Sequence, residues 1–292
     1  MNLMDTRTDA WSPSLLAAVG VDERSLAPIV PSAQITGRIS SLPPLRHDGT
    51  RLLGIPVIAG AADQAAQALA LGAVADDAIA VSIGTSGAAM QAVGEPRPGA
   101  FRHAVPGTWL ALDSTHAAGL ALTWWSGISQ RPVDAVSEPR RAAADLPLFL
   151  PYLQGGRAGH GAPGTLTDLR STHDAGDIAD AVVEGVGIEL VRLVREATLG
   201  RIPEAPIGVG GRAARLDALR GVMAAGLDRP IRYSGFGSAH GAALLAASAA
   251  GWPGPAFEAD AGGDTITLPD PAVAERLTER MARYSHLVDQ LS

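Results

Sequence analysis

The stretch that decides the fold is AIAVSIGTSGAAMQAV, residues 78–93. The apolar run 78–83 suits a buried strand, a glycine-rich turn follows at 84–87, and a second apolar run returns as a strand. Glycine permits positive φ, so successive N–H groups of this turn can point into one concavity and bind phosphate oxygens. Thr85 and Ser86 add hydroxyl donors. A plain hairpin turn needs the same glycines, so the residues alone leave both interpretations open.

Upstream of this stretch, residues 55–74 read IPVIAGAADQAAQALALGAV. The apolar run 55–59 predicts a buried strand, and Asp63 opens an alanine-rich helix that ends near Gly72. A carboxylate just after a strand can accept a proton from a substrate hydroxyl, or hold Mg²⁺ through water. Asp is also a favoured helix N-cap, so Asp63 taken alone can be purely structural.

Downstream of the turn, strand and helix patterns alternate. This alternation, with three consecutive strands in the middle, predicts a mixed α/β sheet covered by helices. A short helix over 11–20 precedes these elements, with Ser12 as its N-cap. We predict further strands at 108–112, 205–209 and 231–233, and further helices at 116–127, 174–199, 213–227, 237–250 and 272–291.

A second glycine turn, GVGGRA at residues 208–213, lies between a predicted strand and a predicted helix. It fits a loose G-x-G-x-x-A dinucleotide fingerprint, with Asp228 near the expected acidic position. The preceding strand is short and late in the chain, so we rank a nicotinamide oxidoreductase low. A turn that approaches another ligand fits the residues better.

The composition excludes several chemistries. The 292 residues are 47% hydrophobic and 18% charged, which is typical of a globular protein. Cysteine is absent, which excludes disulfides, thiolate nucleophiles and cysteine zinc sites. Lysine is absent too, which excludes a GxxxxGK[ST] phosphate loop.

The net charge of −7, without a basic run, argues against nucleic acid as a partner. No run reaches about 18 apolar residues, so we expect no membrane span. The N-terminus lacks the apolar core of a signal peptide, so we expect a cytoplasmic protein.

Several segments, taken in order, resemble the FGGY family of carbohydrate kinases, and within it the xylulokinases. The resemblance extends over essentially the whole chain. The segments are VIAGAADQAAQALALGA (57–73), SIGTSG (82–87), AAGLALTWW (117–125), PYLQGGRAG (151–159), GTLTDLRSTHDAGDIADAVVEG (164–185), GVGGRAARL (208–216) and GSAHGAALLAA (237–247).

The resemblance implies an actin-like, ribonuclease-H-like α/β fold, with ATP and a sugar between two domains. It implies that Asp63 is the general base and, through water, a contact of Mg²⁺. It also implies that Asp63 and Gln64 bind the sugar, although the family usually has Asn at the second position. The nucleotide contacts that it implies are Gly84, Thr85, Ser86, Gly210 and Gly211. The implied reaction transfers the γ-phosphate of ATP to a ketopentose such as D-xylulose.

The same resemblance divides the chain into two parts. Residues 1–77 correspond to a remnant of the N-terminal sugar-binding domain, and residues 78–292 to a complete C-terminal nucleotide-binding domain. The family's D-x-G-T-T/S loop, which grips phosphate and Mg²⁺, does not occur in the sequence. We therefore expect impaired activity for this chain alone, and a homodimer or a complementing N-terminal half as its partner. A non-catalytic module that binds nucleotide or a partner is the alternative.

Overall fold

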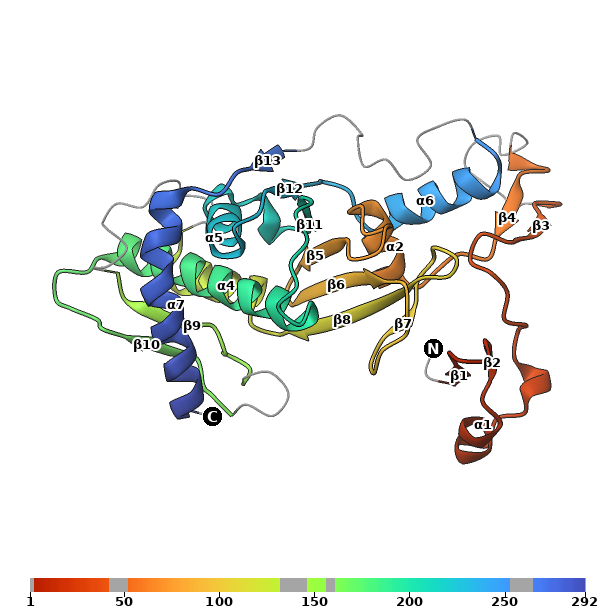
Figure 1. Cartoon of the computed structure of the whole chain (residues 1–292), viewed down its shortest axis with the longest axis horizontal. Coiled ribbons are helices and arrows are strands. Elements are labelled where there is room, and N and C mark those ends of the chain that lie inside the picture. Colours follow the sequence, from red (N-terminus) through yellow and green to blue (C-terminus); the bar gives the residue numbers. More distant parts are fainter. Residues whose placement is uncertain (1–2, 42–51, 132–145, 156–160, 253–264, 292) are drawn as a thin grey trace.

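The computed structural model describes residues 3–41, 52–131, 146–155, 161–252 and 265–291. Its main body is a seven-stranded mixed sheet with the order β13-β12-β11-β5-β6-β8-β7 (Figure 1). These strands are β5 (Ile79–Ile83), β6 (Gly87–Val93), β7 (Phe101–Arg102), β8 (Trp109–Thr115), β11 (Ile207–Gly210), β12 (Ile231–Tyr233) and β13 (Thr265–Thr267).

The centre of the sheet is parallel. Strand β11 pairs in parallel with β5 on one side and β12 on the other, while β6, β8, β7 and β13 join as antiparallel neighbours. The carboxyl ends of β5, β11 and β12 therefore meet at one edge of the sheet. Ligands of open α/β sheets bind at this kind of edge.

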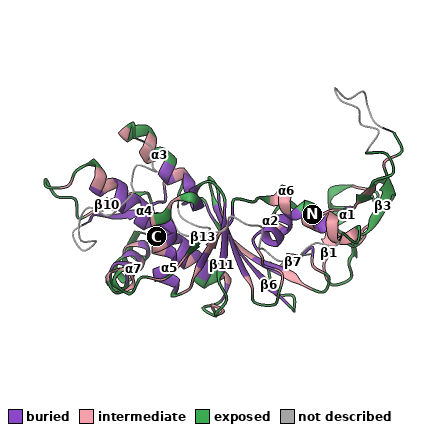
Figure 2. Ribbon diagram, turned by 90° about the horizontal axis from the view of Figure 1, so that it is seen from above, coloured by how far each residue is buried: buried purple, intermediate pink, exposed green. Residues whose placement is uncertain are grey.

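Helices cover both faces of the sheet, as Figure 2 shows. Strand β5 shows why both faces are covered. Its side chains alternate between the two faces of the sheet, and apolar residues therefore need a helix layer on each face. Ile79, Val81 and Ile83 enter the larger core beneath α4, whereas Ala80 enters the core beneath α2. One layer contains α3 (Gly119–Ser129), α4 (Ala175–Ala197), α5 (Asp217–Leu227) and α7 (Pro271–Leu291), and the other contains α2 (Asp63–Ala70) and α6 (Ser238–Ala249).

Helix α4 is the longest element and is buried along most of its length. It begins with a capping box, in which Asp174 accepts from the backbone of Asp177 and Asp177 accepts from the backbone of Asp174. The predicted helix 174–199 is confirmed, and Val182, Val186 and Leu190, spaced four residues apart along it, all lie in the larger core.

Helices α2 and α6 approach so closely that only glycine fits between them. A Cβ at Gly241 would lie 1.7 Å from the carbonyl oxygen of Ala66. Because that oxygen belongs to a helix backbone, it cannot move aside as a side chain would. The glycine of α6 therefore sets how α2 lies on the sheet.

We expect Gly241→Ala to lower the free energy of unfolding by about 1–3 kcal/mol, the usual cost of overpacking a core. Gly221→Ala is the matched control, because Gly221 is also a helix glycine and a Cβ there meets nothing within 4 Å. The control should gain about 0.5–1 kcal/mol, the propensity difference between alanine and glycine. Urea unfolding of the two variants measures both. Equal stabilities would contradict the close approach of α2 and α6.

The N-terminal residues lie at one end of the molecule, beyond α6 (Figure 1). They form two small antiparallel ribbons and short helices, and several of their apolar side chains, such as Val19 and Ile35, are exposed. The elements are β1 (Met4–Asp5), β2 (Ala10–Trp11), α1 (Pro13–Val19), the 3₁₀ helix η1 (Glu23–Ser25), β3 (Ile35–Arg38) and β4 (Pro56–Ile58).

The prediction of a buried strand at 55–59 is wrong in its environment. Strand β4 exists, but it pairs only with β3, and Val57 at its centre is 44% exposed. Pro56 has no N–H to donate to a ladder, which suits an edge position better than a buried one. The predicted helix over 11–20 is confirmed, since Ser12 caps α1 and Gly20 ends it in the left-handed conformation.

Other elements follow the predicted pattern with shifted ends. The predicted helix 213–227 begins with a 3₁₀ turn, η5 (Ala213–Arg215), before α5. The small strands β7, β10 (Thr165–Thr167) and β13 were not predicted, and β10 pairs with β9 (Leu148–Leu150) outside the main sheet. Within the described residues, no helix combines the length and apolar character that a membrane crossing requires.

Candidate functional site

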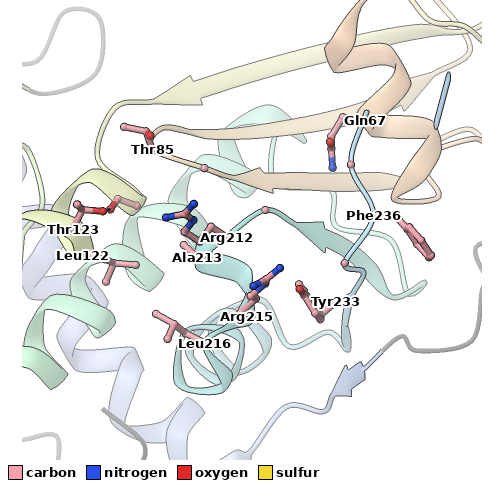
Figure 3. Close-up of a pocket in the computed structure, with 15 residues that line it drawn as sticks. Gln67, Thr85, Leu122, Thr123, Arg212, Ala213, Arg215, Leu216, Tyr233 and Phe236 are labelled. Atoms are coloured by element: carbon pink, nitrogen blue, oxygen red, sulfur yellow. Dashed lines mark hydrogen bonds between the residues drawn. The ribbon is translucent and has the colours of Figure 1, made fainter. Parts of the chain in front are cut away.

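A cavity of about 1050 Å³ lies at the edge where β5, β11 and β12 end. Five segments meet there: helix α2, the β5–β6 turn, the start of α3, the turn after β11 and the loop after β12. Figure 3 shows the labelled side chains around this space. The lining residues are Gln67, Gly84, Thr85, Gly119, Leu122, Thr123, Gly211, Arg212, Ala213, Arg215, Leu216, Tyr233, Gly235, Phe236 and Gly237.

The β5–β6 turn is held by the first turn of α3. The backbone N–H groups of Gly119 and Leu120 donate to the carbonyl oxygens of Gly84 and Thr85, at 3.1 and 2.9 Å. A Cβ at Gly119 would lie 2.1 Å from the oxygen of Gly84, so only glycine permits this contact. The contact also explains why the predicted helix 116–127 begins later, at Gly119.

The predicted nest of N–H groups at 84–87 is not what the turn forms. Neither Gly84 nor Gly87 has a positive φ. The N–H of Gly84 is already used, because it donates to the carbonyl oxygen of Ser86 at 3.0 Å. Gly87 is needed for packing instead, since a Cβ there would lie 2.9 Å from Leu190. The turn therefore offers fewer donors to an anion than its glycine content suggests.

The turn after β11 has the backbone conformation that glycine is needed for. Gly211 has a φ of +102°, and a Cβ there would lie 2.5 Å from the carbonyl oxygen of Ile83. This contact fixes the chain beside the end of β5. A Cβ at Gly210 would meet Leu71 at 2.8 Å and Gln67 at 3.1 Å, so this glycine makes room for α2.

The charge of the cavity comes from two arginines. Arg212 and Arg215 both line it and are exposed, and neither makes an ion pair with a described residue. No Asp or Glu is among the described lining residues. The aromatic side chains Tyr233 and Phe236 lie on the other side, and Phe236 stacks on His240 with ring centroids 3.9 Å apart. Guanidinium groups and aromatic rings in one cavity suit an anion attached to a planar group.

Asp63 lies one helical turn from this cavity. It is the first residue of α2, and Gln67, four residues later on the same face, lines the cavity. The interpretation of Asp63 as an N-cap is wrong, because Ala62 occupies that position without a side-chain bond. The carboxylate of Asp63 is exposed and, among the described residues, accepts only from the N–H of Gln64, at 2.8 Å. It is thus open to solvent.

The structure brings together only some of the sequence-predicted site residues. Gly84, Thr85 and Gly211 line the cavity, whereas Ser86, Gly210, Asp63 and Gln64 are not among the lining residues. Gln64 has a buried side-chain oxygen for which the described residues supply no hydrogen-bond donor. The roles of all seven in binding or catalysis stay predictions.

Sequence reasoning missed most of the side chains that line the cavity. Gln67 and Thr123 lie within the segments quoted above but were not singled out, and Tyr233 and Phe236 lie outside them. Arg212 lay within the quoted GVGGRA turn, and its signal was available: a cation directly after a glycine turn that follows a strand. Asp228 belongs to the opposite edge of the sheet, because it ends α5 and precedes the start of β12. This position removes the acidic partner that a nicotinamide site would need.

A magnesium ion finds little support among the side chains. The described residues contain no group of three His, Asp or Glu side chains that could hold a metal ion. Asp63 supplies one carboxylate, at one helical turn from the cavity-lining Gln67. Magnesium in phosphoryl-transfer sites is commonly held by one or two carboxylates together with the phosphates of the substrate. We therefore derive no step through a metal ion.

A buried polar network ties the end of β8 and the segment after β9 to α4 and α7. The carboxylate of Glu189 accepts hydrogen bonds from Tyr152 at 2.7 Å, Thr115 at 3.1 Å and Tyr284 at 3.2 Å. Arg192 donates to the hydroxyl of Tyr152 at 2.8 Å. Burial, followed by the neighbouring Glu189 carboxylate, raises the pKa of both tyrosines. Both therefore stay protonated and keep donating, so the network holds these helices in place around the site.

The comparisons with known proteins agree with this architecture. Residues 79–250 match the C-terminal domain of the FGGY family of carbohydrate kinases. The chain therefore belongs to this family. It is 28% identical to the xylulose kinase of Escherichia coli over 302 residues, which is 98% of this chain and 58% of that protein. It is 29% identical to a gluconokinase of Bacillus licheniformis over 254 residues, with 77% of this chain and 48% of that protein covered.

Solved structures show the same fold. The crystal structure of a xyloylose kinase from Brucella ovis is 28% identical and superposes with a TM-score of 0.83, covering 99% of this chain and 63% of that one. A Plasmodium falciparum glycerol kinase with ADP is 15% identical with a TM-score of 0.80, which shows the fold alone. The predicted actin-like ATPase fold is confirmed. The chain spans 58% of the length of the Escherichia coli xylulose kinase and 63% of the Brucella ovis protein.

Proposed function

We propose that this chain supplies the nucleotide site and the general base of an ATP-dependent sugar kinase. The observation that carries the proposal is the cavity itself. It joins the carboxyl ends of three parallel strands, contains two guanidinium groups without a carboxylate, and lies one helical turn from Asp63. Membership of the FGGY family adds independent support.

The chemistry that we propose uses few residues. The carboxylate of Asp63 accepts the proton of a sugar hydroxyl as the hydroxyl oxygen bonds to the γ-phosphorus of ATP. The bond from that phosphorus to the bridging oxygen breaks, which gives a sugar phosphate and ADP. Gly84 and Gly211 border the part of the cavity in which we place the phosphates, which we call the phosphate end. Thr85 offers a hydroxyl there. Phosphoryl transfer depends mainly on positioning and charge neutralisation, so a lysine is not required.

The acceptor that we propose is a ketopentose such as D-xylulose, because most of the curated relatives are xylulose kinases. D-gluconate is the second candidate, supported by the gluconokinase match. We propose that the reaction uses ATP with Mg²⁺, and an ATP-consuming reaction favours the cytoplasm. A homodimer, or a partner that supplies an N-terminal half, would cover the exposed apolar side chains of residues 3–41.

We also propose that activity is impaired in these 292 residues alone, since they contain no D-x-G-T-T/S loop. The test is a coupled ADP-release assay with D-xylulose, D-gluconate or glycerol as the acceptor. We expect a weak, acceptor-dependent signal that is strongest with D-xylulose. ADP binding without ADP release in the presence of any of the three acceptors would favour the non-catalytic alternative. Turnover near the median of enzymes, about 10 s⁻¹, would show that the loop is dispensable.

A further inference from the structure

At the phosphate end of the cavity, one side chain, Arg212, is a strong candidate for neutralising the negative charge of the phosphates. Several of the neutral donors at this end are used within the protein. The N–H groups of Gly119 and Leu120 at the start of α3 donate to the carbonyls of the β5–β6 turn, and the N–H of Gly84 donates to Ser86. The hydroxyl of Thr123 donates to the carbonyl oxygen of Gly119 at 3.0 Å. A phosphate chain here needs another source of positive charge.

Arg212 is fixed where that charge is needed. In the parallel pairing of β11 with β5, Gly210 lies opposite Ser82. The contact between Gly211 and the carbonyl of Ile83 keeps the two chains together as they leave the sheet. Arg212, the next residue, therefore emerges beside the β5–β6 turn. In Figure 3 its side chain extends toward the side of the cavity that holds Thr85 and Thr123.

Arg215 differs from Arg212 in position. It ends the 3₁₀ turn η5, and in Figure 3 its side chain extends toward Tyr233, on the side of the aromatic residues. The two arginine side chains thus extend toward different sides of the cavity. Because the chain contains no lysine, arginine is the cation that the sequence can provide here. Its planar fork of donors matches phosphate oxygens in a bidentate manner.

We propose that Arg212 is the side chain that binds the phosphate chain of the nucleotide, and that it determines the preference of the site for phosphorylated ligands. This proposal rests on the proposed function, since it concerns the same cavity. Arg212 acts by charge and hydrogen bonding on the phosphate oxygens. It does not take part in proton transfer, which we assign to Asp63.

The experiment compares Arg212→Ala with the parent for three ligands, namely ADP, adenosine and inorganic tripolyphosphate. Isothermal titration calorimetry at low and high salt gives each dissociation constant. Arg212→Ala should weaken the binding of ADP and of tripolyphosphate by about ten- to hundredfold, the range typical of hydrogen bonds between charged groups. The affinity for adenosine should not change. Arg212→Lys should restore part of the affinity, and high salt should reduce the difference between parent and variant.

Arg201→Ala is the charge-matched control, because Arg201 is exposed, lies outside the cavity lining and makes no ion pair with a described residue. It should bind ADP as the parent does. An unchanged ratio of ADP to adenosine affinity in Arg212→Ala would overturn the proposal and leave the proposed function intact. A greater loss of ADP affinity from Arg215→Ala than from Arg212→Ala would also overturn it. A parent that binds tripolyphosphate through Arg212 but neither ADP nor adenosine would instead contradict the proposed function. A parent that binds none of the three ligands would contradict both.

Discussion

Replacing Asp63 with Asn is expected to lower the rate of phosphoryl transfer to D-xylulose by about 10²–10⁴-fold, the usual contribution of a positioned general base. The affinity for ADP should not change, because Asp63 is not among the cavity-lining residues. Asn keeps the size of the side chain and removes its capacity to accept a proton. Single-turnover transfer of a radiolabelled γ-phosphate measures the rate, and it detects the slow transfer that we expect from this chain.

The control for this variant is Glu95→Gln. Glu95 is an exposed carboxylate beyond the end of β6 that lies away from the β5–β6 turn. Its removal changes the net charge by the same amount and should leave the transfer rate unaltered. If Asp63→Asn and the parent transfer phosphate to the sugar at the same rate, Asp63 is not the base. Equal losses in both variants would indicate a general effect of charge.

Replacing Arg280 with Met is expected to lower the free energy of unfolding by about 3–5 kcal/mol, the usual cost of leaving one partner of a buried ion pair alone. Arg280 of α7 pairs with Glu184 of α4, and both side chains are buried. The same guanidinium donates to the carbonyl oxygens of Leu146 at 3.1 Å and Pro147 at 2.9 Å. The substitution therefore leaves a buried carboxylate and two buried carbonyls without their donor.

The cost of Arg280→Met should depend on pH. Burial raises the pKa of Glu184 above its ordinary value of 4.5, and Arg280 opposes that rise. Without Arg280 the pKa of Glu184 in the folded state rises further. A raised pKa means that the folded state takes up a proton before the unfolded state does, so the variant should recover stability as the pH falls toward 4.5. Urea unfolding at several pH values measures this recovery.

The double variant Glu184→Gln with Arg280→Met provides the control. It removes the charge that Arg280 neutralised, so it should be more stable than Arg280→Met at neutral pH and should lack the recovery at low pH. A single variant that is as stable as the parent at neutral pH would contradict the proposed cost of the unpaired carboxylate.

The sequence predicts five of the seven strands of the main sheet, because each of those five has a local signal. The run 78–93 marks its own hairpin, and α4 shows its buried stripe through spacing alone. The environment of a strand depends on long-range pairing, which explains why 55–59 was wrongly expected to be buried. The strand β7 has only two residues, too few for a periodicity to appear.

The candidate site was less predictable for a similar reason. Gly84 and Gly211 stood out because glycine turns have a sequence signature. The structure shows that the two glycines differ, since Gly211 has a positive φ and Gly84 does not. The convergence of Arg212, Thr123 and Phe236 depends on which strands become neighbours, and no motif contains that information. The division of the chain at residue 77 remains a prediction, although α2 packs closely on α6.

The central claim is that the cavity at the ends of β5, β11 and β12 binds the phosphates of an adenine nucleotide. The most direct test is the affinity for ADP of the parent and of Gly84→Val, measured by isothermal titration calorimetry. Gly84 suits this test because its φ is ordinary and a Cβ there meets only the oxygen of Ser86, at 3.8 Å, so the variant should fold. We predict that the parent binds ADP and that Gly84→Val, with an unchanged unfolding midpoint, does not. Equal ADP affinities in the two proteins would contradict the claim.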